Sequence, residues 1–294
     1  MIDFHTPTLE DKSWVDSVLS HKKGMSCAFT FAQMYLWSIH YGTQIARFGD
    51  CLLGRGGTDH PKYYYPSGKY DIAKVIEVLS ADAAERGEKL DIILAEEWQV
   101  SEIEQAFPGR FVCSSDRDDC DYIYNASDLI ELPGRKYHGK RNHIARFMRE
   151  HPDWSYEPIN DENTEECIKA CHIWHDARTD ADDSLMHERI ILQKALEERG
   201  ILGLNGGLIR CDGQVAAFTL GEPLNSDTYV VHFEKALPGY EGAYPLINNQ
   251  FAVNELGAYK YINREEDLGS EGLRKAKLSY RPVILLDKFN LSER

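Results

Sequence analysis

The sequence lacks several patterns that mark common classes of protein. No run of about 18 apolar residues occurs in its 294 residues, so we expect no membrane-spanning helix. The N-terminus, MIDFHTPTLEDKSW, has acidic residues and no apolar stretch where a secretory signal needs basic and apolar ones. These absences predict a cytoplasmic protein.

Three catalytic signatures are also missing. There is no GxSxG, no Walker A loop and no HExxH. This excludes the nucleophile elbow of α/β-hydrolases, the phosphate loop of P-loop NTPases and the zinc helix of HExxH metalloproteases. Because no cysteine has an evident histidine partner by pattern, nucleophilic catalysis has little support.

Positive charge is scarce. The chain has 33 Lys and Arg against 48 Asp and Glu, a formal net charge of −15. A general DNA-binding protein is usually basic, and an anionic membrane surface would repel this chain. We therefore expect no DNA partner, although a local basic segment remains compatible with the composition.

The seven cysteines are odd in number and irregular in spacing, so we expect reduced thiols. Cys167, Cys171 and His175 would share one helical face and could hold a metal. No second ligand pair with the usual zinc spacing lies nearby, and free cysteine is commonly buried. We interpret the three as an apolar stripe and predict no metal.

The order of predicted elements repeats. Residues 43–54 form a hairpin, residues 71–86 a helix that ends at Gly87, and residues 90–95 an apolar strand. In the second half, a hairpin over 207–221 and a strand over 228–235 precede a helix that ends at Gly257 and a strand from 261. This repetition indicates an internal duplication of one α/β module, with domains over 1–134 and 135–294.

Three stretches carry a resemblance to a known family: YNASDLIELPGRKYHGKRNHIARF, LPGYEGAYPLINNQF and INREEDLGSEGLRKAKLSYRPVILLDKF. With them the chain resembles the bacterial phosphatidylglycerol lysyltransferase C-terminal-domain family, in its soluble stand-alone branch. The resemblance covers nearly the whole chain. It implies an α/β (α+β) protein made of two GNAT-like (acyl-CoA N-acyltransferase) folds, each a mixed sheet flanked by helices, and kinship with the Fem aminoacyltransferases.

The stretch over residues 261–281 has the layout of an α/β active site. A strand start is followed by a polar tip, Gly269 and a helix, and ligands gather at the carboxyl ends of strands. Acyl transfer to an amine needs a base, for which Asp267 is the first choice and Glu266 the second. The alternative is a solvated acidic loop.

The helix that follows offers positive charge. Arg274, Lys277 and Tyr280 share a face, and with Arg264 they could clamp a phosphate or carboxylate. Tyr280 could donate a proton to a leaving group. An exposed basic helix face explains the same pattern.

Two further patterns precede this stretch. Gly239, Gly242 and Ala243 could bring backbone N–H groups to a donor's pyrophosphate at a helix N-terminus, or form a plain strand-to-helix turn. His232 and Glu234 alternate on one strand face and could be a base and its orienting partner. A core histidine with its hydrogen bonds satisfied is the other interpretation.

Residues 135–149 concentrate positive charge without an acid until Glu150. Lys140, Arg141 and Asn142 are the candidates for contacts with tRNA phosphates. Alternatively, this helix bridges the two halves and neutralises the acidic remainder of the chain.

These patterns and the resemblance give three hypotheses. The first is an acyltransferase that moves an aminoacyl group from aminoacyl-tRNA to an amine or hydroxyl of a small-molecule or peptide acceptor. The second is the same fold using acyl-CoA. The third is a non-catalytic protein that binds a small ligand or peptide. In each case we expect no resident cofactor, since the donor is a co-substrate.

Overall fold

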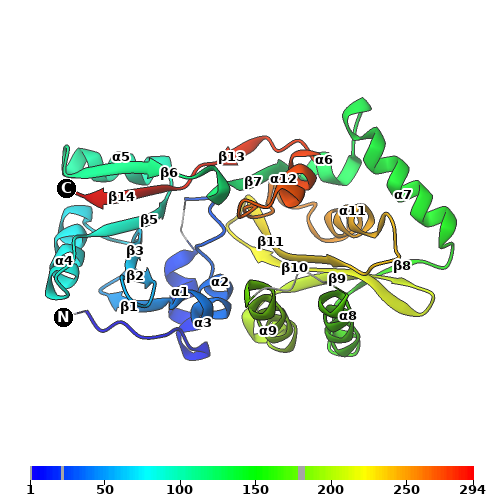
Figure 1. The fold of residues 1–294 in the computed structure, drawn as a ribbon, viewed down its shortest axis with the longest axis horizontal. Helices are drawn as coiled ribbons and strands as arrows, with labels where there is room; N and C mark the ends of the chain where they lie inside the picture. The colour runs from blue at the N-terminus through cyan, green and yellow to red at the C-terminus, as the bar shows by residue number, and fades with distance from the viewer. Residues whose placement is uncertain (1, 21–22, 178–182) are drawn as a thin grey trace. The chain divides into compact units, whose positions relative to one another are not determined.

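The computed structural model describes residues 2–20, 23–177 and 183–294, which divide into two compact units. Unit 1 comprises Met1–Tyr122, Glu265–Lys275 and Leu285–Arg294, and unit 2 comprises Ile123–Arg264 and Ala276–Ile284 (Figure 1). The division therefore differs from a single cut at residue 134. Residues 123–134 belong to unit 2, and two C-terminal segments return to unit 1.

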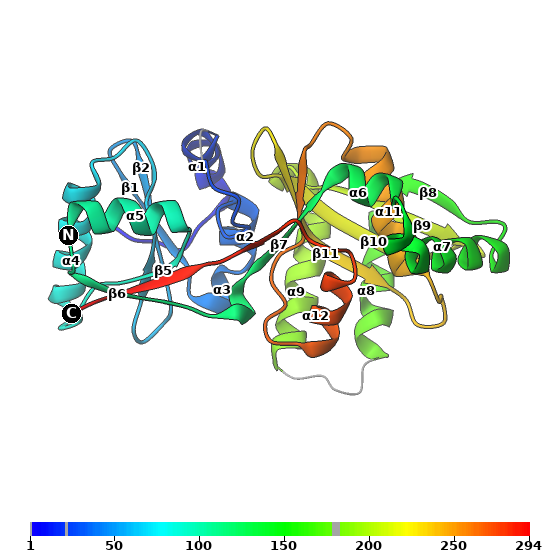
Figure 2. The ribbon, with the colours of Figure 1, turned by 90° about the horizontal axis from the view of Figure 1, so that it is seen from above.

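Unit 1 is built on one mixed sheet. Its strands are β1 (Gln44–Phe48), β2 (Cys51–Gly56), β3 (Lys62–Tyr64), β4 (Ser67–Gly68), β5 (Asp91–Ala95), β6 (Phe111–Ser115) and β14 (Phe289–Glu293). They lie in the order β1-β2-β3-β5-β14-β6, and β4 pairs with β2. The last strand of the chain is antiparallel to both β5 and β6, and in Figure 2 it is the red arrow between them.

The helices of unit 1 follow local sequence signals. They are α1 (Lys12–Leu19), α2 (Phe31–Leu36), α3 (Ser38–Tyr41), α4 (Ile72–Glu85) and α5 (Glu97–Ala106), and α12 (Glu271–Leu278) crosses the unit boundary. Helix α4 begins where the Asp71 carboxylate accepts hydrogen bonds from Ala73 N and Lys74 N, a common N-cap arrangement. It ends before Gly87, which has φ +75°. The helix predicted over 71–86 is thus confirmed.

Unit 2 is built on a second mixed sheet. Its strands are β7 (Asp121–Asn125), β8 (Ser155–Pro158), β9 (Asn205–Cys211), β10 (Gln214–Pro223), β11 (Thr228–Ala236), β12 (Tyr261–Asn263) and β13 (Ile284–Leu286). They lie in the order β13-β7-β12-β11-β10-β9-β8. Strand β12 is parallel to β11 and antiparallel to β7, so the carboxyl ends of β11 and β12 point the same way.

Helices cover both faces of the second sheet. They are α6 (Ala126–Glu131), α7 (His138–Glu150), α8 (Thr164–Asp176), α9 (Asp183–Glu197), α10 (Arg199–Leu202) and α11 (Ala243–Glu255). In Figure 1, α8 and α9 lie below the strands and α11 lies above them. Phe147 of α7 and Leu246 of α11 belong to a buried cluster with Ile209, Ala216 and Ala236 of the sheet. The small alanines let the helices approach the strands closely.

The same succession of elements occurs in both units. The hairpin β1–β2, strand β3, helix α4 and strand β5 correspond to the hairpin β9–β10, strand β11, helix α11 and strand β12. Strand β3 pairs in parallel with β5, and β11 pairs in parallel with β12; unit 1 has the short strand β4 in addition before its helix. The predicted duplicated α/β architecture, two mixed sheets flanked by helices, is confirmed.

All seven cysteines are free, and Cys167 and Cys171 are buried on α8, as an apolar stripe requires. His175, the third residue of that stripe, is also buried.

Within the described residues, no helix combines the length and the apolar character that crossing a bilayer demands.

Gly242 and Gly239 form a matched pair for a test of packing. Both have left-handed φ, +96° and +89°, but a Cβ on Gly242 would lie 2.7 Å from the His143 carbonyl oxygen, whereas a Cβ on Gly239 would meet nothing within 4 Å. We expect Gly239→Ala to lower the free energy of unfolding by about 1 kcal/mol. Gly242→Ala should cost about 1–3 kcal/mol more, because α7 must shift. Urea denaturation measures both, and equal losses would contradict this packing.

Candidate functional site

Five polar or aromatic side chains of unit 2 converge near the carboxyl ends of β11 and β12; we call them the Arg264 cluster. Glu234 lies on β11, Arg264 follows β12, Asn248 lies on α11, Lys140 on α7, and Tyr280 follows α12. Glu234 accepts a hydrogen bond from Arg264 Nη2 at 2.7 Å through one oxygen and from Asn248 Nδ2 at 3.1 Å through the other. The ion pair is buried, with 11–12% of each side chain exposed.

Two atoms of this cluster are buried without a hydrogen-bond partner in the described structure. They are Arg264 Nη1, a donor, and Asn248 Oδ1, an acceptor. Buried polar atoms are nearly always paired, so such atoms call for a ligand or ordered water. A ligand that carries both a carbonyl oxygen and an N–H group, as an α-amino acid derivative does, would satisfy the two atoms together.

Lys140 contributes to the cluster an ammonium group whose pKa is lowered. Burial, followed by the charge of Arg264, lowers the pKa of Lys140 to about 8, against the opposing effect of Glu234. Its Nζ lies 3.7 Å from the centroid of the Tyr280 ring, a cation–π contact. A lysine whose pKa lies near neutrality is suited to accept a proton from an attacking group.

Backbone contacts hold the cluster in place. Lys277 Nζ donates to the Arg264 carbonyl oxygen at 2.6 Å, and the Tyr124 hydroxyl donates to the Lys277 carbonyl oxygen at 2.8 Å. The Tyr280 ring lies 4.8 Å from the Arg264 guanidinium, and burial raises the pKa of Tyr280, so its phenol stays protonated. Arg281, the next residue, has φ +57°, a strained conformation of the kind often found at functional sites.

The first-choice base, Asp267, lies in unit 1 and is fully buried. It accepts hydrogen bonds from Arg274 at 2.7 and 2.8 Å, from the Tyr122 hydroxyl and from Gly269 N. The hydrogen bond from Arg274 is the main cause that holds the pKa of Asp267 well below its usual range. With both oxygens occupied and little basicity, Asp267 anchors the turn into α12 and is poorly suited to take a proton.

The second choice, Glu266, is also in unit 1, where it lines a cavity of about 600 Å³. Its Oε2 lies 3.1 Å from Lys288 Nζ and 3.3 Å from Cys27 Sγ. Lys288 is 2% exposed and also lies 2.7 Å from Asp121. Glu266 is thus part of a buried charge network at the cavity wall.

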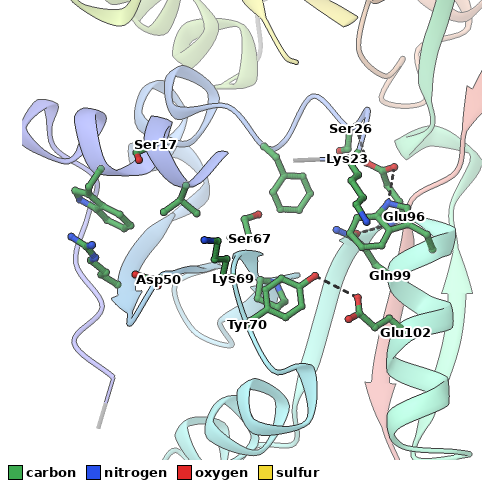
Figure 3. A pocket seen from close by; sticks show the side chains of 18 residues that line it. Ser17, Lys23, Ser26, Asp50, Ser67, Lys69, Tyr70, Glu96, Gln99 and Glu102 are labelled. Atoms are coloured by element: carbon green, nitrogen blue, oxygen red, sulfur yellow. Dashed lines mark hydrogen bonds between the residues drawn. The ribbon is translucent and has the colours of Figure 1, made fainter. Parts of the chain in front are cut away.

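A second cavity of unit 1, of about 790 Å³, is shown in Figure 3. Glu96, at the N-cap of α5, and Gln99 and Glu102, on α5, line it at three-residue spacing. The Tyr70 hydroxyl donates to Glu102 at 3.4 Å, and Met25 N and Ser26 N donate to Glu96 at 2.8 and 3.0 Å. Burial raises the pKa of Glu96. None of the site residues predicted from the sequence lines this cavity. The three-residue spacing of Glu96, Gln99 and Glu102 is the sequence pattern that could have indicated it.

The remaining predicted residues make local contacts. Arg141 donates to the carbonyl oxygens of Leu132 and Gly134, and Asn142 lies 3.1 Å from His138. These residues shape the start of α7. Among the other basic residues of this segment, Lys136 pairs with Asp128 and Arg146 with Glu150 and Glu241, so part of its positive charge is balanced.

His232 and the glycine loop also have structural explanations. His232 is 2% exposed in its side chain and lies 3.0 Å from Glu222, which agrees with a satisfied core histidine. Gly242 faces the His143 carbonyl oxygen of α7, and Ala243 is buried beneath it. The structure therefore gathers Lys140, Glu234, Arg264, Lys277 and Tyr280, and adds Asn248, which the sequence gave no reason to choose.

Comparison with known proteins bears on this site. The family model described as phosphatidylglycerol lysyltransferase, C-terminal, matches residues 23–291. A curated relative, an uncharacterized protein of Mycoplasmoides gallisepticum, is 24% identical over 176 residues, 57% of this chain. The match spans about half, 54%, of that relative.

Solved structures share the architecture across the whole chain. A conserved protein of unknown function from Bacteroides thetaiotaomicron is 37% identical, with a TM-score of 0.95 and complete coverage of both chains. L-PGS from Bacillus licheniformis is 16% identical with a TM-score of 0.68, covering 96% of this chain and 92% of that one. FemX is 10% identical with a TM-score of 0.59, covering 98% and 97%. The likeness to the last two shows that this chain has the same fold as they do.

The Lys140 environment predicts a separately titrating amine. In protein with ¹³C-methylated lysines, one lysine NMR signal should titrate near pH 8. The signals of ordinary lysines should titrate together at about 10.4. Lys140→Arg identifies the signal by its loss. Glu234→Gln should lower this pKa further, because the Glu234 charge opposes the shift. A Lys140 signal that titrates together with those of the ordinary lysines would contradict the described burial.

The lowered pKa of Lys140 also determines the direction in which the free energy of unfolding changes with pH. Between pH 8 and about 10.4 the unfolded chain binds more protons at Lys140 than the folded chain, so the free energy of unfolding rises with pH in this interval. The control Lys140→Met should lack this contribution.

The buried charge network of unit 1 predicts a stability loss. Lys288→Met leaves Asp121 and Glu266 without their cation and should lower the free energy of unfolding by about 3–5 kcal/mol. Lys89→Met, at an exposed lysine of the same unit, should stay within about 0.5 kcal/mol. Similar denaturation midpoints for the two variants would show that the network is not required.

Proposed function

The chain belongs to the phosphatidylglycerol lysyltransferase C-terminal family, and from this membership we propose that it is an aminoacyltransferase. We propose further that it moves an aminoacyl group from aminoacyl-tRNA to the amine or hydroxyl of a small-molecule or peptide acceptor. The observation that supports this most is the Arg264 cluster. There a buried donor and a buried acceptor without protein partners lie with a lysine of lowered pKa.

The cluster offers a complementary group for each part of an aminoacyl ester. Asn248 Oδ1 can accept a hydrogen bond from the α-amino group, and Arg264 Nη1 can donate to the ester carbonyl oxygen. The guanidinium charge would then stabilise the negative charge that develops on this oxygen in the transition state. Glu234 holds Asn248 and Arg264 in the required orientation.

Lys140 supplies the proton transfer in this proposal. Its neutral form takes a proton from the attacking amine or hydroxyl as the new acyl bond forms. The ester bond to the terminal ribose then breaks, and the proton passes to the departing ribose oxygen. With a pKa of about 8, roughly a tenth of Lys140 is neutral at pH 7, enough for a base that is regenerated in each cycle.

The donor's tRNA would be held by charge on residues 135–149, which lead into α7 and form most of it. Arg135 and Arg149 are exposed at the two ends of this segment, and Lys140 lies between them. On a chain of net charge −15, such a restricted basic surface would confine phosphate contacts to one place. Its binding should weaken steeply with salt, because phosphate contacts release counterions.

The acyl-CoA alternative has less support. A pyrophosphate cradle at 239–243 would need open space beside both of its glycines, but α7 fills the space beside Gly242 and leaves only that beside Gly239 open. Glu241, which pairs with Arg146 at 3.0 Å, adds a negative charge to the loop.

Hydroxylamine, a small amine acceptor, allows the donor half-reaction to be tested without knowledge of the natural acceptor. With charged tRNA, the protein should accelerate formation of the aminoacyl hydroxamate. Lys140→Met and Arg264→Met should each reduce this rate by about 100-fold or more. Lys275→Met, at an exposed lysine, is the matched control and should retain the wild-type rate.

Equal rates for all variants, or consumption of an acyl-CoA with no consumption of any aminoacyl-tRNA, would refute the proposal.

A further inference from the structure

Four side chains of unit 2 that take no part in the Arg264 cluster meet beside the β9–β10 turn; we call them the His151 group. His151 ends α7, Asp153 precedes β8, Cys211 ends β9, and Asp212 is in the turn. Single ligand atoms of His151, Cys211 and Asp212 all lie within 4.8 Å of one another. Asp153 lies beside these three residues, with its Oδ1 3.9 Å from Cys211 Sγ.

The distances within the group are close to those of a tetrahedral metal site. Cys211 Sγ lies 3.6 Å and His151 Nδ1 3.7 Å from Asp212 Oδ2. Tetrahedral bonds of about 2.3 Å to sulfur and about 2.0–2.1 Å to nitrogen or oxygen place neighbouring ligand atoms roughly 3.3–3.6 Å apart. The ligand atoms of His151 and Cys211 lie within 4.8 Å of each other, so the three atoms would need to close by at most about 1 Å to share one ion.

The acidic side chains of the group form no ion pair with a lysine or arginine among the described residues. Asp212, with 66% of its side chain exposed, lies 3.7 Å from His151, and Asp153 is also exposed. Another sulfur–carboxylate group, Cys27 with Asp121 and Glu266, instead encloses Lys288. A divalent cation would balance the negative charge of the His151 group, as Lys288 balances that of Asp121 and Glu266.

The ligands are held in position by their own packing. The His151 ring lies 4.7 Å from the Phe147 ring and 5.5 Å from the Tyr240 ring. Asp212 N donates to Asp153 Oδ2 at 2.7 Å, which fixes one carboxylate against the turn. Asp212 and Gly213 both have positive φ, +51° and +73°, as a two-residue hairpin turn requires. The site would therefore need little rearrangement to bind an ion.

We propose that the His151 group binds Zn²⁺. One thiolate, one imidazole and one carboxylate match the mixed N, S and O preference of zinc, whereas Mg²⁺ and Ca²⁺ take oxygen ligands. The ion would tie the end of α7 to the β9–β10 hairpin and, through Tyr240, to the loop that carries Gly239 and Gly242. Asp153 would support the site from beside these ligands, where it accepts a hydrogen bond from Asp212 N.

Co²⁺ replaces Zn²⁺ in such sites and reports its ligands by absorption. Added to the metal-free full-length protein, Co²⁺ should give the visible bands of tetrahedral coordination and a near-ultraviolet thiolate charge-transfer band, and one equivalent of Zn²⁺ should remove both. Cys211→Ser should abolish the charge-transfer band and weaken Zn²⁺ binding about 100-fold or more. Cys113→Ser, at an exposed cysteine of unit 1, is the control and should change neither.

A second variant, Asp153→Asn, tests the proposal independently in case Cys211→Ser does not fold. Asp153→Asn keeps the shape of the side chain and should weaken Zn²⁺ binding about 10-fold or more while the thiolate band persists. Absence of the bands in wild-type protein, or wild-type bands and affinity in Cys211→Ser, would overturn the proposal.

Discussion

The buried ion pair between Glu234 and Arg264 is the constraint on which the candidate site depends. A guanidinium and a carboxylate that are both nearly removed from water are tolerable only when paired and further hydrogen-bonded. Here Glu234 also accepts from Asn248, and the Arg264 carbonyl oxygen accepts from Lys277. The pair fixes the side chains of β11, α11 and the segment after β12. The positive charge of Arg264 also contributes to the low pKa of Lys140.

The duplicated module explains where this constraint can form. In unit 2, β11 and β12 are parallel neighbours, so residues at their carboxyl ends lie at one edge of the sheet. Glu234 is near the end of β11 and Arg264 follows β12, which brings the two opposite charges together. Unit 1 repeats the parallel arrangement in β3 and β5, but there the buried charges include Lys288, which precedes the C-terminal strand β14. The two copies thus share a topology and differ in their chemistry.

The architecture could be predicted from the sequence because it is encoded locally. Glycines that end helices, hairpin turns made of one Gly and one Asp, and apolar strands recur in the same order in both halves. The boundaries could not be predicted in this way. Strand β14 inserts between β5 and β6, nearly two hundred residues away in the chain, and this pairing leaves no local signal.

The site was predictable only in part, for a conformational reason. The five polar residues from Asn263 to Asp267 suggested one polar tip, but Glu265 has φ +57°. The strand alternation ends at this residue, so Arg264 belongs to unit 2 while Glu266 and Asp267 belong to unit 1. Likewise, a glycine in a sequence can indicate close packing of another element, but it does not identify that element. At Gly242 the element is α7. Asn248 looked like one polar residue on an apolar helix face.

The central claim is that Arg264 Nη1 and Asn248 Oδ1 recognise an aminoacyl group. Calorimetric titration with a series of amino acid amides, which carry the amine and carbonyl of the donor without its reactive ester, tests it most directly. The account predicts binding of at least one amide, weakened about tenfold or more by Asn248→Leu and by Arg264→Met. Binding of the amide with unchanged affinity by both variants, or no binding of any amide to the wild-type protein, would contradict it.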